Sequence, residues 1–352
     1  MIGTIMLRLM VAVGGMLMAT TGEARTGVPA LDAERHLLVL RNDRVVVGIS
    51  PRLAGRIVVF RAPDGVNVLD ADPVWWAPEA KLPALAAAWD YPAINGHVIW
   101  TGPQKEWWIH QTISEEWRTH AYNWPPDPWG EWAPYEVAAR TPASVTLTGP
   151  ASPVTGLRLT KEVGLLPDGR VRIAVRAVNT RDREVSWDLW SNVRVRGTAR
   201  SWVPVTGSLK IEHGAAADGS LAALDYEVRD GWFRFLDEAP IPAGAVARTA
   251  KAFLTPSAGL IAAFDAGRVF LRRFTPAARA AVHPDQGVVE VFRRADRDPA
   301  KSLCELEVHG AFTSLPPGGT MALEETWELR RYPGSAEPAA QAAWLKALPP
   351  SP

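Results

Sequence analysis

Tryptophan, a residue type suited to stacking on a sugar ring, is concentrated in one stretch of this chain. Ten of the sixteen tryptophans lie between residues 75 and 132, and they are Trp75, Trp76, Trp89, Trp100, Trp107, Trp108, Trp117, Trp124, Trp129 and Trp132. Because the indole N–H needs a hydrogen-bond partner, tryptophan favours surfaces that are apolar but wet. A sugar fits such a surface, since its C–H face stacks and its hydroxyls bind neighbouring polar groups. The alternative interpretation is a loop-rich segment that buries its indoles as a minor core, and both can hold for different tryptophans.

Six residues of this stretch are candidates for binding a mono- or oligosaccharide. The tryptophans would stack on the sugar and the two polar residues would bind its hydroxyls: Trp100, Trp108, Trp124, Trp129, Gln104 and Asp127. The run WPPDP at residues 124–128 has a second interpretation, a rigid polyproline-like turn with an architectural role. Farther along, Trp187 and Trp190 are three residues apart on an expected strand, so they face opposite sides and one of them belongs to the core.

Other chemical motifs are absent from the sequence. It contains no GxGxxG, P-loop, GxSxG, HExxH or acidic calcium loop. His97, His110 and His120 lack the tight spacing of a zinc site. Cys304 is the only cysteine, and its strand-like surroundings predict a buried side chain. We therefore expect neither a metal nor a cofactor.

The charge of the chain limits the classes of partner. Lysine and arginine number 38, aspartate and glutamate also number 38, and the formal net charge is zero. Nucleic acids and anionic membrane surfaces are bound by clusters of basic residues, and the sequence has no block of lysines or arginines. A neutral chain rich in tryptophan favours an uncharged partner.

The N-terminus predicts export. An uncharged apolar run at residues 9–19 has the length of a signal peptide and is too short to span a membrane. Gly22 and Ala24 suit a cleavage site, so we expect a signal peptide over residues 1–24 and a mature chain from Arg25. This predicts a periplasmic or extracellular protein without a membrane contact after cleavage. A retained N-terminal anchor is the alternative.

Most of the remaining chain has the pattern of short strands. Residues 157–163 and 170–178 flank the turn LPDG and alternate polar with apolar side chains, which predicts a hairpin with one wet and one buried face. Other expected strands are residues 44–49, 55–60, 144–148, 184–195, 224–228, 232–236, 260–264, 269–273, 288–292, 302–308 and 321–329. Helical periodicity is confined to residues 83–88 and 339–348. The pattern predicts an all-β sandwich or barrel, with one domain at residues 25–334 and a Pro/Ala-rich tail at residues 335–352.

Three groups of motifs resemble those of galactose-mutarotase-like (aldose-1-epimerase-like) proteins. The first is VGISPRLAG at residues 47–55, followed by RIVVF at 56–60 and DGVNVL at 64–69. The second is LLPDG at residues 165–169 with NTRD at 179–182, and the third is CELEV at 304–308 with LPPGG at 315–319 and EETWEL at 324–329. The resemblance spans about residues 40–330. NGHVIWTGPQ at residues 95–104 and WPPD at 124–127 are more similar to an exported bacterial branch of that fold than to the mutarotases proper.

The resemblance implies an all-β supersandwich of large antiparallel sheets with few short helices and a concave carbohydrate-binding face. The tryptophan-rich stretch, about residues 75–132, would then be a long insertion lining that face. Mutarotases use a glutamate on a late strand as general base, and Glu305 matches its place, although Glu307 points the same way and leaves the register open by one pair. Their acid is a histidine on the strand after the NTRD-type turn.

That strand, EVSWDLWSNV at residues 184–193, contains no histidine, and Trp190 or Asn192 occupies the neighbourhood. His97 is the candidate substitute, and His309 follows the Glu305 strand toward the expected cleft rim. Three hypotheses remain. The chain is an exported carbohydrate-binding protein, a sugar epimerase or other carbohydrate-active enzyme that uses Glu305, or a periplasmic structural or assembly factor that binds protein.

Overall fold

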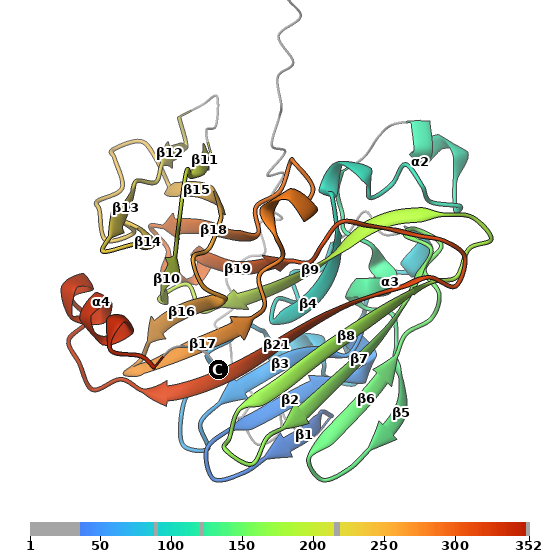
Figure 1. Cartoon of the computed structure of the whole chain (residues 1–352), viewed down its shortest axis with the longest axis horizontal. Helices are drawn as coiled ribbons and strands as arrows, with labels where there is room; N and C mark the ends of the chain where they lie inside the picture. The colour runs from blue at the N-terminus through green and yellow to red at the C-terminus, as the bar shows by residue number, and fades with distance from the viewer. Residues whose placement is uncertain (1–35, 88–90, 120–122, 215–218, 350–352) are drawn as a thin grey trace, which may run out of the picture.

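The computed structural model describes residues 36–87, 91–119, 123–214 and 219–349 (Figure 1). The expected signal peptide at residues 1–24, Trp89 and His120 lie outside these described residues. Among the described helices, none is both long enough and apolar enough to cross a membrane.

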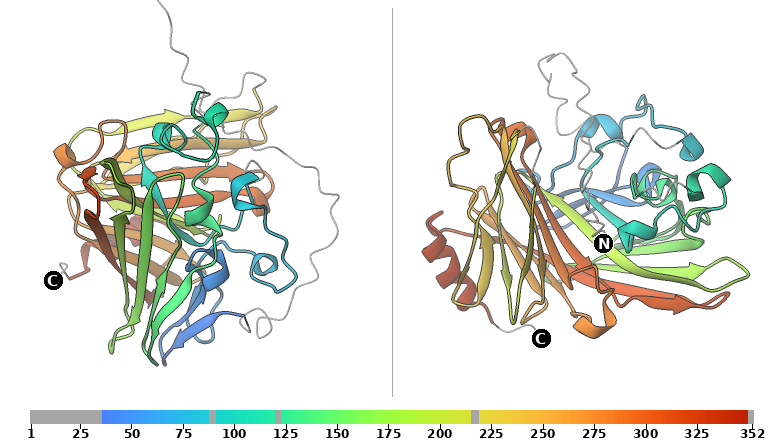
Figure 2. Two further views of the ribbon diagram at one scale, coloured as in Figure 1. Left: turned by 90° about the vertical axis from the view of Figure 1, so that its right-hand side faces the viewer. Right: turned by 90° about the horizontal axis from the view of Figure 1, so that it is seen from above.

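Two large β-sheets pack against each other as layers (Figure 2). The first has 11 strands, in the order β1 (Leu38–Arg41), β2 (Val46–Ser50), β3 (Arg56–Arg61), β4 (His97–Gly102), β9 (Val185–Val195), β19 (Leu303–His309), β18 (Val289–Asp296), β15 (Ala247–Leu254) and β11 (Lys210–His213), with β12 (Leu221–Ala223) beside β15 and β20 (Thr313–Leu315) beside β9. The second has 10, in the order β13 (Tyr226–Arg229), β14 (Trp232–Phe235), β10 (Arg200–Pro204), β16 (Leu260–Asp265), β17 (Arg268–Phe274), β21 (Thr320–Arg331), β8 (Val171–Asn179), β7 (Leu157–Leu165), β6 (Ser144–Thr148) and β5 (Glu136–Arg140).

Helices are few and short, as the sequence predicts. They are α2 (Glu115–Thr119), α3 (Pro128–Glu131) and α4 (Pro338–Lys346), and the helix expected at residues 83–88 is a single 3-10 turn, Leu85–Ala87. α4 packs Ala342 and Leu345 onto the outer side of the second sheet, against Trp202 and Phe264. The predicted all-β fold is confirmed, and the strand neighbours along both main orders are antiparallel.

The predicted hairpin is the pair β7–β8. Its register runs from Leu157 opposite Asn179 to Leu165 opposite Val171, and buried and partly exposed side chains alternate along both strands. Gly169 closes the turn with a φ of 85°, a left-handed conformation that glycine adopts without a steric cost. Local sequence therefore determines this part of the fold.

The two faces of the first sheet have different surroundings, and β9 distinguishes them. The Ser191 hydroxyl points at the second sheet, where it donates to Glu325 of β21 at 2.8 Å. Because side chains alternate along a strand, Trp190 and Asn192 point the other way. We call the face of the first sheet that carries Trp190 its outer face, and the face that carries Ser191 its inner face.

The chain between β4 and β5 covers the outer face beside β4 and β9 (Figures 1 and 2). Trp107 of this segment lies 5.8 Å from Trp190, measured between ring centroids, and Trp124 lies 6.3 Å from Trp107. Tyr91, which precedes β4, contacts Trp124 at 4.8 Å. We call Tyr91, Trp107 and Trp124 the aromatic roof, and the described residues between β4 and β5 the roof segment. The stretch at residues 75–132 is thus more than a loop insertion, because it also contributes β4 to the middle of the sheet.

Candidate functional site

Charged side chains gather on the outer face because of the register between β9 and β19. Glu305 lies opposite Arg194, Glu307 opposite Asn192, and His309 opposite Trp190. Alternation places all six on one face. The next two strands add Glu290, opposite Glu307 on β18, and Lys251 on β15. The outer face under the aromatic roof therefore holds acids, cations and an indole together. We call this group the Glu307 cluster, and its members are Glu290, Glu305, Glu307, His309, Lys251, Asn192, Arg194 and Trp190.

Glu305, the predicted base, is bound on this face by its neighbours on β9. Its Oε1 accepts from Arg194 Nε at 2.6 Å and from Asn192 Nδ2 at 3.2 Å. Arg194 in turn donates to the side-chain oxygen of Asn95, whose amide donates to Asp70 Oδ2 at 2.9 Å. The negative charge of Glu305 is thus neutralised by an ion pair that is itself held in place.

Glu307 has a different environment. Its Oε2 accepts from the Trp190 indole at 2.9 Å and from Lys251 Nζ at 3.1 Å, whereas its Oε1 has no hydrogen-bond partner. The side chain is 0% exposed. Burial raises the pKa of Glu307 to about 7, against the opposing attraction of Lys251 and with a further rise from Glu290. Of the two glutamates whose register was open, Glu307 is the one with a fully buried oxygen that has no partner.

His309 supplies an imidazole next to that carboxyl. Its ring lies 4.8 Å from the Trp190 ring between centroids, and its Nδ1 is 3.4 Å from Asp188 Oδ2. Burial lowers the pKa of His309, but Glu290 and Asp188 outweigh it and raise the pKa to about 9. A histidine therefore stands beside Trp190, but it comes from β19 and not from β9, the strand on which the resemblance places one.

Lys251 and Glu290 complete the cluster, and neither was predicted as a site residue from the sequence. Lys251 Nζ is 2.6 Å from Glu290 Oε2 and 4.8 Å from the centroid of the Trp190 ring. The Lys251 side chain keeps 22% of its surface exposed, and that of Arg194 keeps 11%, so this rim of the cluster reaches solvent. The only available signal was the polar alternation of Lys251 within an alanine-rich strand.

The aromatic roof is tied to the sheet through one carboxylate. Glu131 of α3 pairs with Arg56 of β3 at 2.5 Å and also accepts from the Trp100 indole. The Tyr91 hydroxyl donates to the same carboxylate at 3.3 Å. The Trp100 ring stands nearly perpendicular to Trp190, at 4.9 Å between centroids. These contacts fix the indoles that line the covered side of the cluster.

The predicted sugar-stacking tryptophans differ in how far they are exposed. Trp108 is 0% exposed and donates to the Pro125 carbonyl at 2.6 Å, so it is a core residue without a surface for a ligand. Trp100 is buried on the outer face, and Trp124 and Trp129 are partly exposed. Of the predicted set, Trp100 contacts Trp190 at the cluster, and Trp124 lies one ring farther out, against Trp107 and Tyr91.

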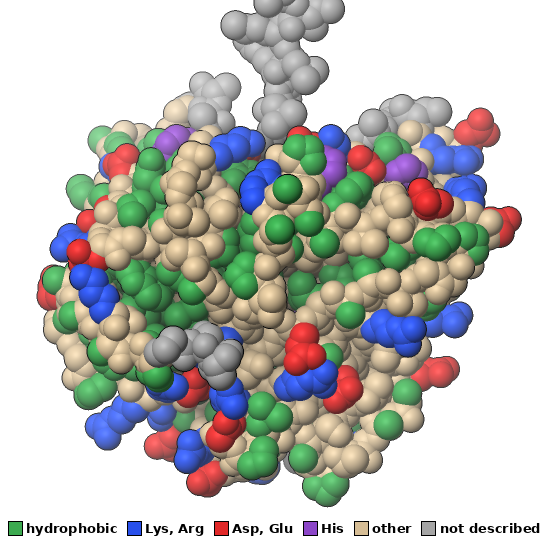
Figure 3. Space-filling view, in the orientation of Figure 1, with side chains coloured by type: hydrophobic (Ala, Val, Ile, Leu, Met, Phe, Trp, Pro, Cys, Tyr) green, Lys and Arg blue, Asp and Glu red, His purple; other side chains and the backbone are tan. Residues whose placement is uncertain are grey.

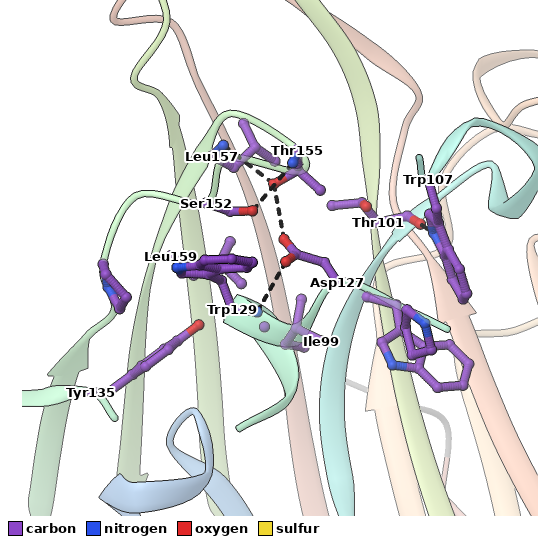
Figure 4. A pocket seen from close by; sticks show the side chains of 14 residues that line it. Ile99, Thr101, Trp107, Asp127, Trp129, Tyr135, Ser152, Thr155, Leu157 and Leu159 are labelled. Carbon is purple, nitrogen blue, oxygen red and sulfur yellow. Dashed lines mark hydrogen bonds between the residues drawn. The ribbon is translucent and has the colours of Figure 1, made fainter. Parts of the chain in front are cut away.

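The side chains of the two residues predicted to bind sugar hydroxyls already form hydrogen bonds within the protein. Gln104 donates to the Asn123 carbonyl at 3.0 Å. Asp127 caps α3 by accepting from the Trp129 amide at 3.0 Å, and it also accepts from Thr155 Oγ1 at 3.3 Å. With Trp129 it lines a cavity of about 20 Å³ between the roof segment and β7 (Figure 4). That volume suits about one water and not a sugar ring.

His97 lies on the inner face and does not meet Glu305. It is the first residue of β4 and not part of a turn, and its Nε2 is 3.0 Å from Ser191 Oγ and 3.3 Å from Glu325. Burial lowers its pKa to about 4. Arg272 completes this group by pairing with Glu325 at 2.6 Å. Serine, histidine and glutamate are neighbours here, and all of them are enclosed between the sheets.

The remaining surface carries both signs of charge. On the face drawn in Figure 3, acidic and basic side chains are interspersed. Many charged side chains of the described residues form pairs, such as Arg172 with Glu324 at 2.6 Å. His110 is exposed and lies 3.4 Å from Glu106. This mixture agrees with the zero formal charge of the sequence.

Comparison with known families gives one match over most of the chain. The family model described as "Domain of unknown function (DUF4380)" matches residues 36–330. No curated protein matches the chain in sequence.

Solved structures match the fold at low identity. The Slr1438 protein from Synechocystis sp. PCC 6803 is 12% identical with a TM-score of 0.52, and the match covers 84% of this chain and 96% of that one. A TPR-domain containing protein from Parabacteroides distasonis ATCC 8503 is 13% identical with a TM-score of 0.51, over 90% of this chain and 50% of that one. A galactose mutarotase-like protein from Lactobacillus casei ATCC 334 is 11% identical with a TM-score of 0.49, over 84% of this chain and 100% of that one. These matches show a likeness of fold alone, and the predicted export stays a prediction.

Proposed function

This chain belongs to the DUF4380 family, and we propose that it binds a carbohydrate on the outer face of its first sheet, between the aromatic roof and the Glu307 cluster. The fold is carbohydrate-related, because galactose mutarotase-like structures share it. Fold alone does not assign a function, so the proposal depends on the side chains of the site.

The observation that carries the proposal is a pair of buried oxygens without hydrogen-bond partners. Glu307 Oε1 and Asn192 Oδ1 belong to residues that lie directly opposite each other on β19 and β9. The orientation of the Asn192 amide is fixed, because its nitrogen donates to Glu305. Buried acceptors without a donor are costly, and the hydroxyls of a sugar are donors. The Trp190 ring lies beside them, and its indole donates to the other oxygen of Glu307 at 2.9 Å.

A glycan screen with matched variants tests the proposal. The chain from Arg25 to Pro352 is applied to a broad glycan array, and the affinity for any bound glycan is then measured by calorimetry. We expect Asn192→Ala and Trp124→Ala each to weaken binding by about tenfold or more, because a buried hydrogen bond or a stacking face is lost. Trp344→Phe, on α4 at the second sheet, is the control that keeps wild-type affinity. A folded chain that binds no glycan, or variants that bind like wild type, would contradict the proposal.

A second candidate function is acid–base chemistry on the bound sugar, and it is favoured by the free oxygen of Glu307. In ring opening, Glu307 would take the proton of the anomeric hydroxyl, the bond from the anomeric carbon to the ring oxygen would break, and His309 would give its proton to that oxygen. Ring closure on the other face would return both protons. Glu305 is a poorer base because its ion pair with Arg194 stabilises the charged carboxylate, and both Arg194 and Asn192 donate to its Oε1.

Exchange of anomers, followed by NMR, separates this candidate from binding alone. We expect Glu307→Gln to lower the exchange rate by about 10²–10⁴-fold, Glu305→Gln to lower it less, and the exposed Glu324→Gln to leave it unchanged. Wild-type protein that binds sugar without accelerating exchange supports the purely binding function. If no glycan binds but a partner protein is captured reproducibly, the hypothesis of a structural or assembly factor is favoured instead.

We also propose that the protein works outside the cytoplasm, which rests on the apolar run at residues 9–19 and the small residues before Arg25. Recovery of the protein from the periplasm or the medium with Arg25 as its first residue supports this proposal. An intact N-terminus in the cytoplasmic fraction contradicts it.

A further inference from the structure

Two glutamates and a histidine on the outer face form a group with the composition of a metal site. Glu290, Glu307 and His309 each offer one ligand atom, and these atoms lie within 4.8 Å of one another. The sheet fixes their positions, because Glu307 and His309 alternate on β19 and Glu290 lies opposite Glu307 on β18. All are at most 1% exposed. Imidazole with carboxylates suits first-row divalent ions such as Zn²⁺, Co²⁺ and Mn²⁺.

Two of the three groups have a buried atom that is free to coordinate. Glu307 Oε1 and His309 Nε2 make no hydrogen bond, although both are enclosed by protein. The other Glu307 oxygen is used, since it accepts from Trp190 and from Lys251. His309 Nε2 lies 3.4 Å from Glu290 Oε1, so the free nitrogen points into the group. Buried polar atoms without partners call for a ligand. Glu307 Oε1 is an electron-pair donor when the carboxyl is ionised, and His309 Nε2 becomes one when an incoming cation displaces its proton.

A second layer of contacts orients these groups as it does in metal sites. His309 Nδ1 faces Asp188 Oδ2 at 3.4 Å, and the other Asp188 oxygen accepts from the Gly102 amide at 2.9 Å. Metal-binding histidines commonly donate their second ring nitrogen to a carboxylate in this way. Glu290 Oε1 is held by the Gly287 amide at 2.8 Å.

The charges leave room for a divalent ion. Asp188, Glu290 and Glu307 carry three negative charges when ionised, and Lys251 supplies one positive charge beside Glu290 Oε2 at 2.6 Å and Glu307 Oε2 at 3.1 Å. With His309 neutral, as a metal ligand must be, two negative charges remain. Lys251 contacts the Oε2 atoms and leaves Glu307 Oε1 free. We propose that Glu290, Glu307 and His309 bind one first-row divalent cation on the side of the carboxylates away from Lys251.

The ion would take the same Glu307 oxygen that the proposed function assigns to a sugar hydroxyl, so metal titration without any sugar tests this inference separately from the proposed function. Untagged full-length protein is treated with a chelator, dialysed, and titrated by calorimetry with Zn²⁺, Co²⁺ and Mn²⁺ separately. Visible absorption of the Co²⁺ form reports nitrogen and oxygen ligation. We expect one ion per chain, and we expect His309→Ala and the near-isosteric Glu307→Gln each to weaken binding by at least about tenfold. His110→Ala, an exposed histidine of the roof segment, is the matched control that keeps wild-type affinity.

For the Lys251→Met variant we expect the opposite change in metal affinity. Removing the ammonium removes its repulsion of a cation bound to the same carboxylates, so we expect tighter binding than in wild type. Circular dichroism establishes that each variant is folded. Wild-type protein that binds no ion overturns the inference, as does binding that is equally strong in folded Glu307→Gln. An affinity that Lys251→Met leaves unchanged or weakens places the ion elsewhere and also overturns it.

Discussion

Arg56 of β3 and Glu131 of α3 form an ion pair of 2.5 Å in which neither side chain is more than 1% exposed. The pair joins the first sheet to the segment that carries most of the aromatic roof, and the same carboxylate accepts from Trp100 and Tyr91. A buried charge that loses its partner is costly, so this pair controls whether the roof stays docked.

We expect Glu131→Ala to lower the free energy of unfolding by about 3–5 kcal/mol, because it leaves Arg56 buried and unpaired. Urea denaturation measures the change. Lys105→Met serves as the control, since its pair with Asp285 is 2.5 Å long but more than half exposed on both sides and is worth at most about 1 kcal/mol. A loss in Glu131→Ala no larger than that in Lys105→Met would contradict the assigned role.

His97, on the inner face, should make the protein less stable in weak acid. Burial lowers the pKa of His97 to about 4, below the 6.5 of an unfolded chain. As pH falls from 6.5 toward 4, the unfolded chain gains a proton that the folded chain does not, so unfolding is favoured by up to about 3 kcal/mol. Urea unfolding at several pH values measures this slope. In His97→Gln the slope should flatten over that window, whereas exposed His110→Gln should keep it; equal slopes in both variants would refute the assignment.

Trp108 and Trp124 are predicted to respond in opposite ways to substitution by alanine. Trp108 is fully buried against Trp117, with ring centroids 5.4 Å apart, and its removal should cost about 3–5 kcal/mol of stability. Trp124 is partly exposed, so its removal should cost less stability and more ligand affinity. Urea denaturation and calorimetry with the glycan found on the array measure the two quantities. A stable Trp108→Ala that has lost glycan affinity would show that Trp108, and not its neighbours, meets the ligand.

The parts of the fold that local sequence determines could be predicted. The β7–β8 hairpin follows from alternation and the LPDG turn, and the bounds of β9 and β21 lie within a few residues of those expected. β4 was missed because all six of its residues are buried on both faces, which removes the alternation that marks a strand. Its tryptophan and glycine then resemble a loop.

The candidate site depends on pairing between distant strands, which one sequence does not encode locally. Glu305 and Glu307 were correctly expected on one face, but only the pairing of β19 with β9 shows that Arg194 and Asn192 occupy the first and leave an oxygen of the second free. Lys251 lies on β15, whose alanines gave no strand signal. Likewise, the burial of Trp108 results from the packing of the roof segment and not from its spacing.

The absence of a side chain at Gly102 lets Gln286, in the loop before β18, approach β4 closely. A Cβ on Gly102 would lie 2.3 Å from the Gln286 amide and 2.6 Å from Asp188 Oδ1. Asp188 orients His309, so Gly102→Ala has to displace both the Gln286 side-chain amide and this carboxylate. We expect a loss of about 1–3 kcal/mol in stability from overpacking, together with weaker binding of the ion or sugar at the cluster. Gly164→Ala on β7 is the control, because its Cβ would meet only Ser144 at 4.0 Å. If Gly102→Ala matches Gly164→Ala in both urea denaturation and ligand titration, the loop yields without moving Asp188, and the cluster does not depend on that close approach.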